Sequence, residues 1–335
     1  MKEEKGVRLV EAEGVRLFPV GLGTWQFGSG EWGYGTAYAE HVAPRIVERS
    51  LDLGVDVIDT AEIYGFGRSE RIVGAALARR RDEAFLATKL FPVLPVEPVA
   101  GWRARGSLRR LATDHVDLYQ LHFPNPVVPT RRVADALAAL LDAGVTRHVG
   151  VSNYSLANWQ SLEEALGRPV LSNQVRYSLV DRAAERELLP WAQAHGRVII
   201  AYSPLAQGLL SGRYGPSRRP TGLRARSGAF RPENLAAAAP LLDVLREIAS
   251  AHGVTPAQVA LAWLVRRPNV VVIPGASSVE QAEQNAASAD IELSAAEDEA
   301  LTLASDAYRP ARSVVRARAE LVGRRLRRVL DGLRA

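Results

Sequence analysis

The sequence predicts an α/β protein, a (β/α)8 TIM barrel with an extra C-terminal helical segment. Eight short apolar runs alternate with eight segments of helical periodicity over about 270 residues, the usual size of such a barrel. No linker divides the 335-residue chain into two units. An open, doubly wound sheet has the same alternation, but the count of eight favours the closed barrel.

The expected strands are rich in β-branched residues and continuously apolar, as is typical of buried parallel strands. They cover residues 20–25, 55–60, 84–89, 116–122, 145–152, 171–177, 198–204 and 270–275. The expected helices lie between them and cover residues 38–53, 69–79, 99–111, 131–143, 156–166, 185–195, 255–266 and 279–288. Residues 211–234, rich in glycine, proline and arginine, interrupt the alternation after the seventh strand. Long loops of this kind often cover functional sites.

Local signals support several helix boundaries. Residues that favour helix starts stand at Ser69, Thr130 and Thr255. Glycines, which readily adopt the left-handed conformation that ends a helix, stand at Gly54, Gly144, Gly196 and Gly253.

We expect residues 1–308 to form the barrel domain, with one acidic helix after Ser294, and residues 309–335 to form an arginine-rich helical tail. The tail has nine arginines against Glu320 and Asp331, a net charge of +7, so the rest of the chain carries 5 − 7 = −2. The positive charge is therefore concentrated in the tail and not spread over a binding face. No nucleic-acid partner is expected.

The tail also has an apolar helical face. Its members are Val315, Val322, Leu326, Val329, Leu330 and Leu333. We expect this face to pack on the barrel or on a second subunit, which would make a homo-oligomer through the tail. An anionic membrane surface is the remaining alternative, and no membrane partner is expected.

Composition excludes several classes of site. The chain has no cysteine, so disulfides, thiolate nucleophiles and cysteine-based metal sites are excluded. No apolar run approaches the roughly 20 residues that span a bilayer. The first residues lack the apolar core of a signal peptide. These features predict a soluble, cytoplasmic protein.

Lysine is rare in this chain. Of 42 basic residues, only Lys2, Lys5 and Lys89 are lysine, which leaves 42 − 3 = 39 arginines. The single internal lysine, Lys89, suggests a position that needs a compact ammonium group in place of a guanidinium. Chance is the alternative explanation.

Polar residues stand at the ends of four successive predicted strands. They are Asp59, Lys89, His122 and the pair Ser152-Asn153, and Tyr64 follows Asp59 by five residues. Each alone has an ordinary explanation, such as a capping residue, a surface ion pair or a buried histidine. Because barrel enzymes place their chemistry where strands end, the set together predicts an active site there.

Proton delivery is the chemistry that these residues share. A tyrosine has a reference pKa of about 10, and a nearby ammonium favours the phenolate, so Lys89 should make Tyr64 a better acid. Asp59 would keep Lys89 charged, and a neutral His122 would orient a carbonyl oxygen. With a cofactor that supplies hydride, this is a carbonyl reduction site.

Seven motifs in order make the chain resemble the aldo-keto reductases over roughly residues 17 to 305. They are residues 59–65 (DTAEIYG) with Ser69-Glu70, Thr88-Lys89, Leu121-His122, residues 150–153 (GVSN), Asn173-Gln174 with Tyr177, residues 201–210 (AYSPLAQGLL), and residues 273–275 (IPG). The resemblance implies a (β/α)8 barrel and hydride transfer from a nicotinamide cofactor to an aldehyde or ketone. It implies catalytic roles for Asp59, Tyr64, Lys89 and His122, with Tyr64 as the proton donor.

The resemblance also implies a cofactor site, with NADP favoured and NAD the alternative. The expected cofactor-binding residues are Gly23, Thr24, Trp25, Asp59, Ser152, Asn153, Gln174, Tyr202, Ser203, Pro204, Leu205, Gln207, Gly208, Arg213, Ile273, Gly275, Ala276, Ser277, Gln281, Gln284 and Asn285. The expected substrate pocket, for a small-molecule carbonyl compound, consists of Trp25, Trp32, Tyr64 and His122.

The chain departs from many family members after the eighth strand. Lysine or arginine holds the 2′-phosphate of NADP in those members, whereas this chain has Ser277 and Ser278, and it has Gln281 where an arginine often follows. An arginine from residues 211–234 is a candidate to replace the missing charge.

The sequence also raises three other interpretations. Residues 28–33 (GSGEWG) match a dinucleotide-binding pattern, but no helix opens on the third glycine, which favours a substrate-side loop. A metal-dependent hydrolase would need grouped histidines, and the six histidines are scattered, so no metal is expected. A regulatory module that binds the cofactor with little turnover is the main alternative, and the complete set of four residues favours an enzyme.

Overall fold

The protein is a closed barrel of parallel strands, as the sequence predicts. The computed structural model describes residues 6–28, 35, 37–215 and 218–311. The barrel strands are β3 (Leu22–Gly23), β4 (Val57–Asp59), β5 (Phe85–Leu90), β6 (Val116–Leu121), β7 (Thr146–Ser152), β8 (Val170–Arg176), β9 (Val198–Tyr202) and β10 (Val270–Val272). They pair in chain order from β3 to β10. A parallel bridge between Val20 and Val272 joins the two edge strands and closes the barrel.

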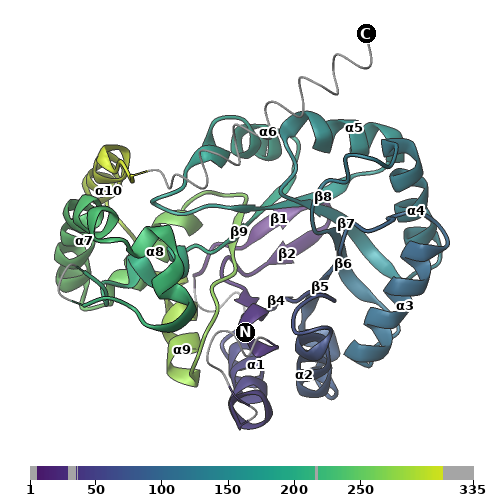
Figure 1. The fold of residues 1–335 in the computed structure, drawn as a ribbon, viewed down its shortest axis with the longest axis horizontal. Coiled ribbons are helices and arrows are strands. Elements are labelled where there is room, and N and C mark those ends of the chain that lie inside the picture. Colours follow the sequence, from purple (N-terminus) through teal and green to yellow (C-terminus); the bar gives the residue numbers. More distant parts are fainter. Residues whose placement is uncertain (1–5, 29–34, 36, 216–217, 312–335) are drawn as a thin grey trace.

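Helices surround the strands, and Figure 1 shows them as a ring. They are α1 (Ala43–Asp52), α2 (Arg68–Leu77), α3 (Val99–Leu111), α4 (Thr130–Asp142), α5 (Leu156–Leu166), α6 (Leu188–Ala194), α7 (Pro232–His252), α8 (Pro256–Val265), α9 (Val279–Ala287) and α10 (Ala295–Ala307). The predicted helices over residues 99–111 and 156–166 are confirmed to the residue, and the acidic helix after Ser294 is α10.

Helix boundaries follow local chemistry in most places. Thr255 begins α8 with a reciprocal capping box to Gln258, and Gly253 ends α7 in the left-handed conformation. Ser69 is not a helix cap, because Gly67 caps α2 and Ser69 lies inside it, fully buried. The helix α2 begins at Arg68, one residue before the predicted start, and the hydroxyl of Ser69 is used in the core instead of as a cap.

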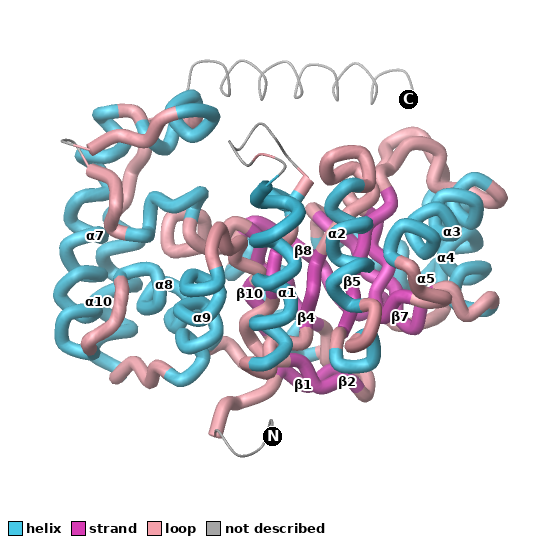
Figure 2. The backbone as a smooth tube through the Cα atoms, turned by 90° about the horizontal axis from the view of Figure 1, so that it is seen from below, coloured by secondary structure: helices cyan, strands magenta, loops and turns pink. Residues whose placement is uncertain are grey.

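A hairpin that the sequence analysis did not identify covers the N-terminal end of the barrel. Its strands β1 (Val10–Ala12) and β2 (Val15–Leu17) pair antiparallel, and Figure 2 shows them beneath the other strands. Val10 and Leu17 pack with Val57, Leu118 and other apolar side chains of the barrel interior. This end is therefore sealed, which leaves the C-terminal end open for a site.

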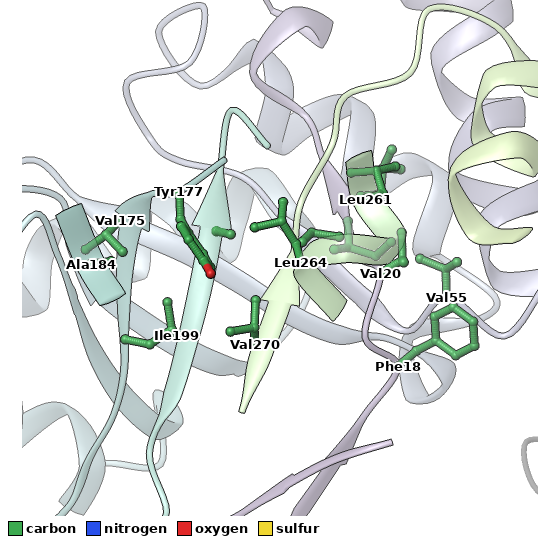
Figure 3. Close-up of a cluster of buried hydrophobic side chains, with 14 of the residues drawn as sticks. Phe18, Val20, Val55, Val175, Tyr177, Ala184, Ile199, Leu261, Leu264 and Val270 are labelled. Atoms are coloured by element: carbon green, nitrogen blue, oxygen red, sulfur yellow. The ribbon is translucent and has the colours of Figure 1, made fainter. Parts of the chain in front are cut away.

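A second apolar cluster lies between the strands and the helices. Figure 3 shows Leu261 and Leu264 of α8 and Val270 of β10 among the side chains of this cluster. Ile199 of β9 and Tyr177 lie in the same cluster, and all five side chains are at most 1% exposed. Burial of each such side chain contributes about 1.5–3 kcal/mol to the free energy of folding. This layer therefore holds α8 against the strands β9 and β10.

Within the described residues, no single helix is long and apolar enough to cross a membrane. The helices α7 and α8 satisfy that criterion only when taken together, and they are bent by 93° at their junction.

Candidate active site

The strand ends bring the predicted catalytic residues together at the C-terminal end of the barrel. Asp59 is the last residue of β4, Lys89 is the penultimate residue of β5, and His122 directly follows β6. These strands are neighbours in the sheet. Tyr64 reaches the same place from the loop between β4 and α2.

Lys89 is fully buried and makes three polar contacts. Its Nζ donates to Oδ2 of Asp59 at 2.6 Å, to the carbonyl oxygen of Thr60 at 2.9 Å and to the hydroxyl of Tyr64 at 3.4 Å. An ammonium has three N–H groups, so all of them are used. Burial lowers the pKa of Lys89, but Asp59 and Tyr64 outweigh burial, and its pKa is raised. Lys89 is therefore a permanent positive charge next to the phenol.

Two amide side chains hold the other oxygen of Asp59. Oδ1 accepts from Nε2 of Gln174 at 2.7 Å and from Nε2 of Gln120 at 3.4 Å. With Lys89 on Oδ2, Asp59 faces donors on both oxygens. Such an arrangement gives each oxygen of Asp59 a donor and fixes the orientation of the carboxyl group toward Lys89.

Burial dominates the acidity of Tyr64. The pKa of Tyr64 is raised because its burial penalises the phenolate more than Lys89 favours it. This net direction is opposite to the one predicted from the nearby ammonium of Lys89, because the sequence does not show how completely the phenol is buried. Tyr64 is thus a neutral phenol that carries its proton at ordinary pH.

His122 is a neutral ring beside Tyr64. The two ring centroids are 5.8 Å apart, with the rings edge to face. Burial and the charge of Lys89 lower the pKa of His122 to about 3. Its Nδ1 is buried and has no hydrogen-bond partner in the part of the chain that the structure describes. The ring can therefore orient a polar group without introducing a charge.

Close backbone contact fixes the loop that carries Tyr64. Gly65 has φ +55°, and a Cβ atom there would lie 2.2 Å from the carbonyl oxygen of Gly28. Below this contact, the buried hydroxyl of Ser69 bonds those of Thr24 and Thr60, at 2.8 and 2.9 Å. The loop is thereby tied to the ends of β3 and β4, which holds the phenol in place.

A cavity of about 810 Å³ opens above Tyr64, and every predicted cofactor-binding residue lines it. Of the predicted substrate pocket, Trp25, Tyr64 and His122 also line it. Trp32 belongs to residues 29–34, which lie outside the described residues, as does most of the glycine-rich pattern at residues 28–33. Lys89 lies beneath the cavity wall.

Amide groups line the cavity at the ends of β7 and β8. Asn153 has φ +61°, and its Nδ2 donates to Oγ of Ser152 at 2.9 Å and to the carbonyl oxygen of His122 at 3.3 Å. Its Oδ1 accepts from the hydroxyl of Tyr202 at 2.9 Å. The hydroxyl of Ser152 donates to the carbonyl oxygen of Gln174 at 2.9 Å. These contacts give a rigid polar wall beside the Tyr202 ring.

The segment after β9 has an unusual backbone. Ser203, Ala206, Gln207 and Gly208 all have positive φ, between +48° and +99°. Successive turns of this kind form concave backbone surfaces that suit anionic oxygens. Arg224 donates from Nε to the carbonyl oxygen of Gln207 at 3.2 Å, so an arginine of the predicted 211–234 loop lies against this segment, and Arg213 lines the same cavity.

Among the described residues that line the cavity after β10, none is a lysine or an arginine. The amide and hydroxyl of Ser277 both donate to Oε1 of Gln281, at 2.9 and 2.8 Å. Ser278 caps α9 by accepting from the amide of Gln281. The structure therefore shows a neutral, hydrogen-bonded turn where the sequence lacks lysine and arginine.

Several cavity residues were not identified from the sequence. They are mainly apolar or cationic: Ile63, Phe66, Phe91, Phe123, Arg176 and Arg224. Phe91 directly follows the end of β5, and Phe123 is the second residue after the end of β6. The strand-end position that identified Lys89 and His122 could therefore have identified both phenylalanines. Within the described residues, no group of three or more histidines and carboxylates could hold a metal ion.

Comparisons with known proteins agree with this geometry. A family model described as the aldo/keto reductase family matches residues 19–305. An uncharacterized oxidoreductase of Mycobacterium tuberculosis is 53% identical over 305 residues, covering 91% of this chain and 94% of that protein. A methylglyoxal reductase of Escherichia coli is 36% identical over 284 residues, covering 84% and 89%. The crystal structure of an aldo/keto reductase of Klebsiella pneumoniae in complex with NADP and acetate has a TM-score of 0.72 at 33% identity, covering 92% and 97%.

Proposed function

Because this chain belongs to the aldo/keto reductase family, we propose that Tyr64, Lys89, Asp59 and His122 are the catalytic residues of its carbonyl reduction. The protein is an oxidoreductase that reduces an aldehyde or ketone to an alcohol with NAD(P)H. The observation that carries the assignment of residues is the buried contact chain from Asp59 through Lys89 to the hydroxyl of Tyr64, at the base of the cavity.

The residue roles follow from the contacts. Tyr64 donates its phenolic proton to the carbonyl oxygen as hydride reaches the carbonyl carbon, so that C=O becomes CH–OH. Lys89 stabilises the phenolate that remains, and Asp59 keeps Lys89 charged and in position. His122 is neutral, so it binds the carbonyl oxygen as a dipole and does not compete with Tyr64 as an acid. These residues would accelerate the reaction because they stabilise the negative charge that develops on the oxygen atoms in the transition state.

The residues present fit a nicotinamide dinucleotide. When bound, reduced nicotinamide supplies the hydride. The amides of Asn153 and Gln174 and the ring of Tyr202 would hold the nicotinamide, and the concave segment at Ser203–Gly208 with Arg213 would hold the pyrophosphate. We propose NADP as the cofactor, which the complex of the Klebsiella pneumoniae relative supports. The neutral turn at Ser277 leaves NAD as the alternative.

We also propose that the barrel domain spans residues 1–308 and that residues 309–335 form a separate tail. Ala311 exchanges two hydrogen bonds with the side chain of Asn234, so the first residues of the tail are attached at the start of α7. The predicted apolar face of the tail lies outside the described residues, and its association with a second subunit stays a prediction.

Replacement of the proposed acid tests the function. NADPH consumption is measured against a panel of aliphatic and aromatic aldehydes with the wild type and with Tyr64→Phe, alongside NADPH affinity from quenching of tryptophan fluorescence. We expect Tyr64→Phe to lower kcat by about 10²–10⁴-fold, the usual contribution of a general acid, with NADPH affinity nearly unchanged.

The matched control is Tyr308→Phe, which removes the hydroxyl of a buried tyrosine outside the cavity. It should leave turnover unchanged. Equal turnover in Tyr64→Phe and the wild type would refute the assignment of Tyr64. Tight NADPH binding by a wild type that reduces no carbonyl compound would favour the regulatory module instead.

A further inference from the structure

We propose that the substrate is an aldehyde or ketone with an extended apolar tail, and that the tail lies on an exposed surface beside the cavity mouth. This inference rests on the proposed function and specifies its substrate class. We call the surface the apolar rim and define it as Phe66, Val93, Leu94, Phe123 and Val127. A long-chain aliphatic aldehyde is the simplest compound that fits.

Aromatic rings surround the place where the carbonyl must lie. Phe123 stacks on His122, with centroids 4.9 Å apart and planes 3° from parallel. Phe91 contacts both rings edge to face, at 6.2 and 6.4 Å. On the other side, the ring of Trp25 is 6.4 Å from that of Tyr64. A carbonyl group between Tyr64 and His122 would therefore extend its remaining atoms into apolar surroundings.

Two members of the apolar rim, Phe66 and Phe123, line the cavity, and Val93, Leu94 and Val127 lie on the segments after β5 and β6. Nine large hydrophobic side chains are exposed in the described residues. Seven of them lie at the C-terminal end of the barrel, on the segments after β3, β4, β5 and β6. Phe66 is 92% exposed and Val127 is 85% exposed. Single exposed hydrophobics are ordinary, but a cluster at the mouth of a site marks a binding surface.

Hydrogen bonds hold the rim loops in one shape. The side chain of Asn125 donates to the carbonyl oxygen of Pro92 at 2.7 Å, which joins the loop after β6 to the loop after β5. Its Oδ1 accepts from the amide of Val127 at 2.8 Å, and Arg103 donates to the carbonyl oxygen of Val93 at 2.8 Å. The rim is therefore preformed, which limits the entropy lost when a tail binds.

Charge divides the cavity mouth into two halves. The arginines that line the cavity, Arg176, Arg213 and Arg224, come from the end of β8 and the loop after β9. The rim residues lie on the segments after β4, β5 and β6, which are different strands from those that carry the arginines. All five rim residues are uncharged. Of the charged residues near the rim, Glu62 and Arg103 are paired with each other. A polyhydroxylated or carboxylated tail would find no polar partner among the rim side chains, whereas an alkyl tail would cover them.

A series of straight-chain aldehydes from propanal to decanal tests the inference. Complete burial of a methylene contributes about 0.8 kcal/mol, close to fourfold in affinity. A tail on an open surface is half buried, so we expect kcat/KM to rise about twofold per methylene. Polar aldehydes of equal length, such as aldoses, should be reduced with far lower kcat/KM than decanal.

Paired variants locate the tail. The double variant Leu94→Ser, Val127→Ser should lower the ratio of kcat/KM for decanal to that for propanal by about tenfold. The matched control is Leu303→Ser, because Leu303 is 61% exposed on α10, away from the cavity, compared with 57% for Leu94. It should change neither the ratio nor the activity with propanal.

Three results would overturn the inference. A flat or falling dependence on chain length, with propanal still reduced through Tyr64, would refute the apolar tail and leave the proposed function intact. An unchanged decanal-to-propanal ratio in the double variant, with a shift in sedimentation from dimer to monomer, would show that the rim joins two copies of the chain. Absence of reduction with every straight-chain aldehyde and with the matching 2-ketones would refute the apolar-tailed substrate, and absence of reduction with every aldehyde and ketone tested would end the proposed function as well.

Discussion

Lys89 shows how a single residue connects composition to mechanism. It is the only internal lysine in a chain with 39 arginines among 42 basic residues, and it is fully buried with all three N–H groups in use. A guanidinium presents five N–H donors in a planar fork and could not satisfy this small tetrahedral site. These contacts support the interpretation that position 89 needs a compact ammonium group.

The pH dependence of reduction follows from His122 and Tyr64. His122, with its pKa lowered to about 3, is neutral throughout ordinary pH. Tyr64, with its pKa raised above the usual 10, keeps its proton in the same range. Because kcat/KM reports the free enzyme, we expect it to be flat from pH 5 to 9 and to fall only above pH 10, where the phenol ionises. The profile should be measured at constant ionic strength with one aldehyde.

His122→Gln is the control for this profile, since glutamine does not titrate. An inflection between pH 6 and 7 in the wild type that is absent from His122→Gln would contradict a neutral His122. The direction of the shift for Tyr64 was not predicted from the sequence, because the balance between burial and a nearby ammonium depends on how completely the site is enclosed.

At the scale of elements, the helices with a regular apolar periodicity were the ones that the sequence predicted best. The helices α3 and α5 have their predicted bounds because nothing interrupts their apolar spacing. The helix α7 was not among the predicted helices, although Gly253 was expected to end a helix. Pro240 lies inside α7, and proline ordinarily ends a helix. The first strand was predicted over residues 20–25, but β3 has only two residues, because Val20 and Gly21 instead pair with Val272 to close the barrel.

The loop after β9 yields a prediction of its own. Arg224 lies against the concave segment at Gln207, which we assign to the pyrophosphate. A charged hydrogen bond contributes about 1.5–3 kcal/mol, so we expect Arg224→Ala to weaken NADPH and NADH alike, each by roughly tenfold or more. Both affinities should be measured by fluorescence titration.

Arg246→Ala is the control for this loop, because Arg246 pairs with Asp243 on α7 outside the cavity. It should change neither affinity. Loss of NADPH affinity with unchanged NADH affinity would contradict the pyrophosphate assignment and would place Arg224 at the 2′-phosphate, as the replacement for the missing charge near Ser277.

For the whole molecule, the alternation of strands and helices was enough to predict the closed barrel and the end that carries the site. All 21 cofactor-binding positions that the family resemblance implied line one cavity. Many follow strand ends, which converge in a parallel barrel, whereas Gln281, Gln284 and Asn285 come from α9. The N-terminal hairpin was not predicted, since its strands of three residues are too short for a periodic signal. The apolar rim was not predicted either, because it combines single residues from loops that only the fold brings together.

The central claim is that Asp59, Lys89 and Tyr64 act as one unit in proton delivery. The most direct measurement is a double-mutant cycle on the rate constant for single-turnover NADPH oxidation, with Tyr64→Phe, Lys89→Met and both together, each checked for folding by circular dichroism. Groups that act as a unit give non-additive losses. We predict that each single variant loses about 10²–10⁴-fold and that the double variant loses no more than the worse single one. Losses that multiply in the double variant would show that Lys89 and Tyr64 act independently and would contradict the proposed mechanism.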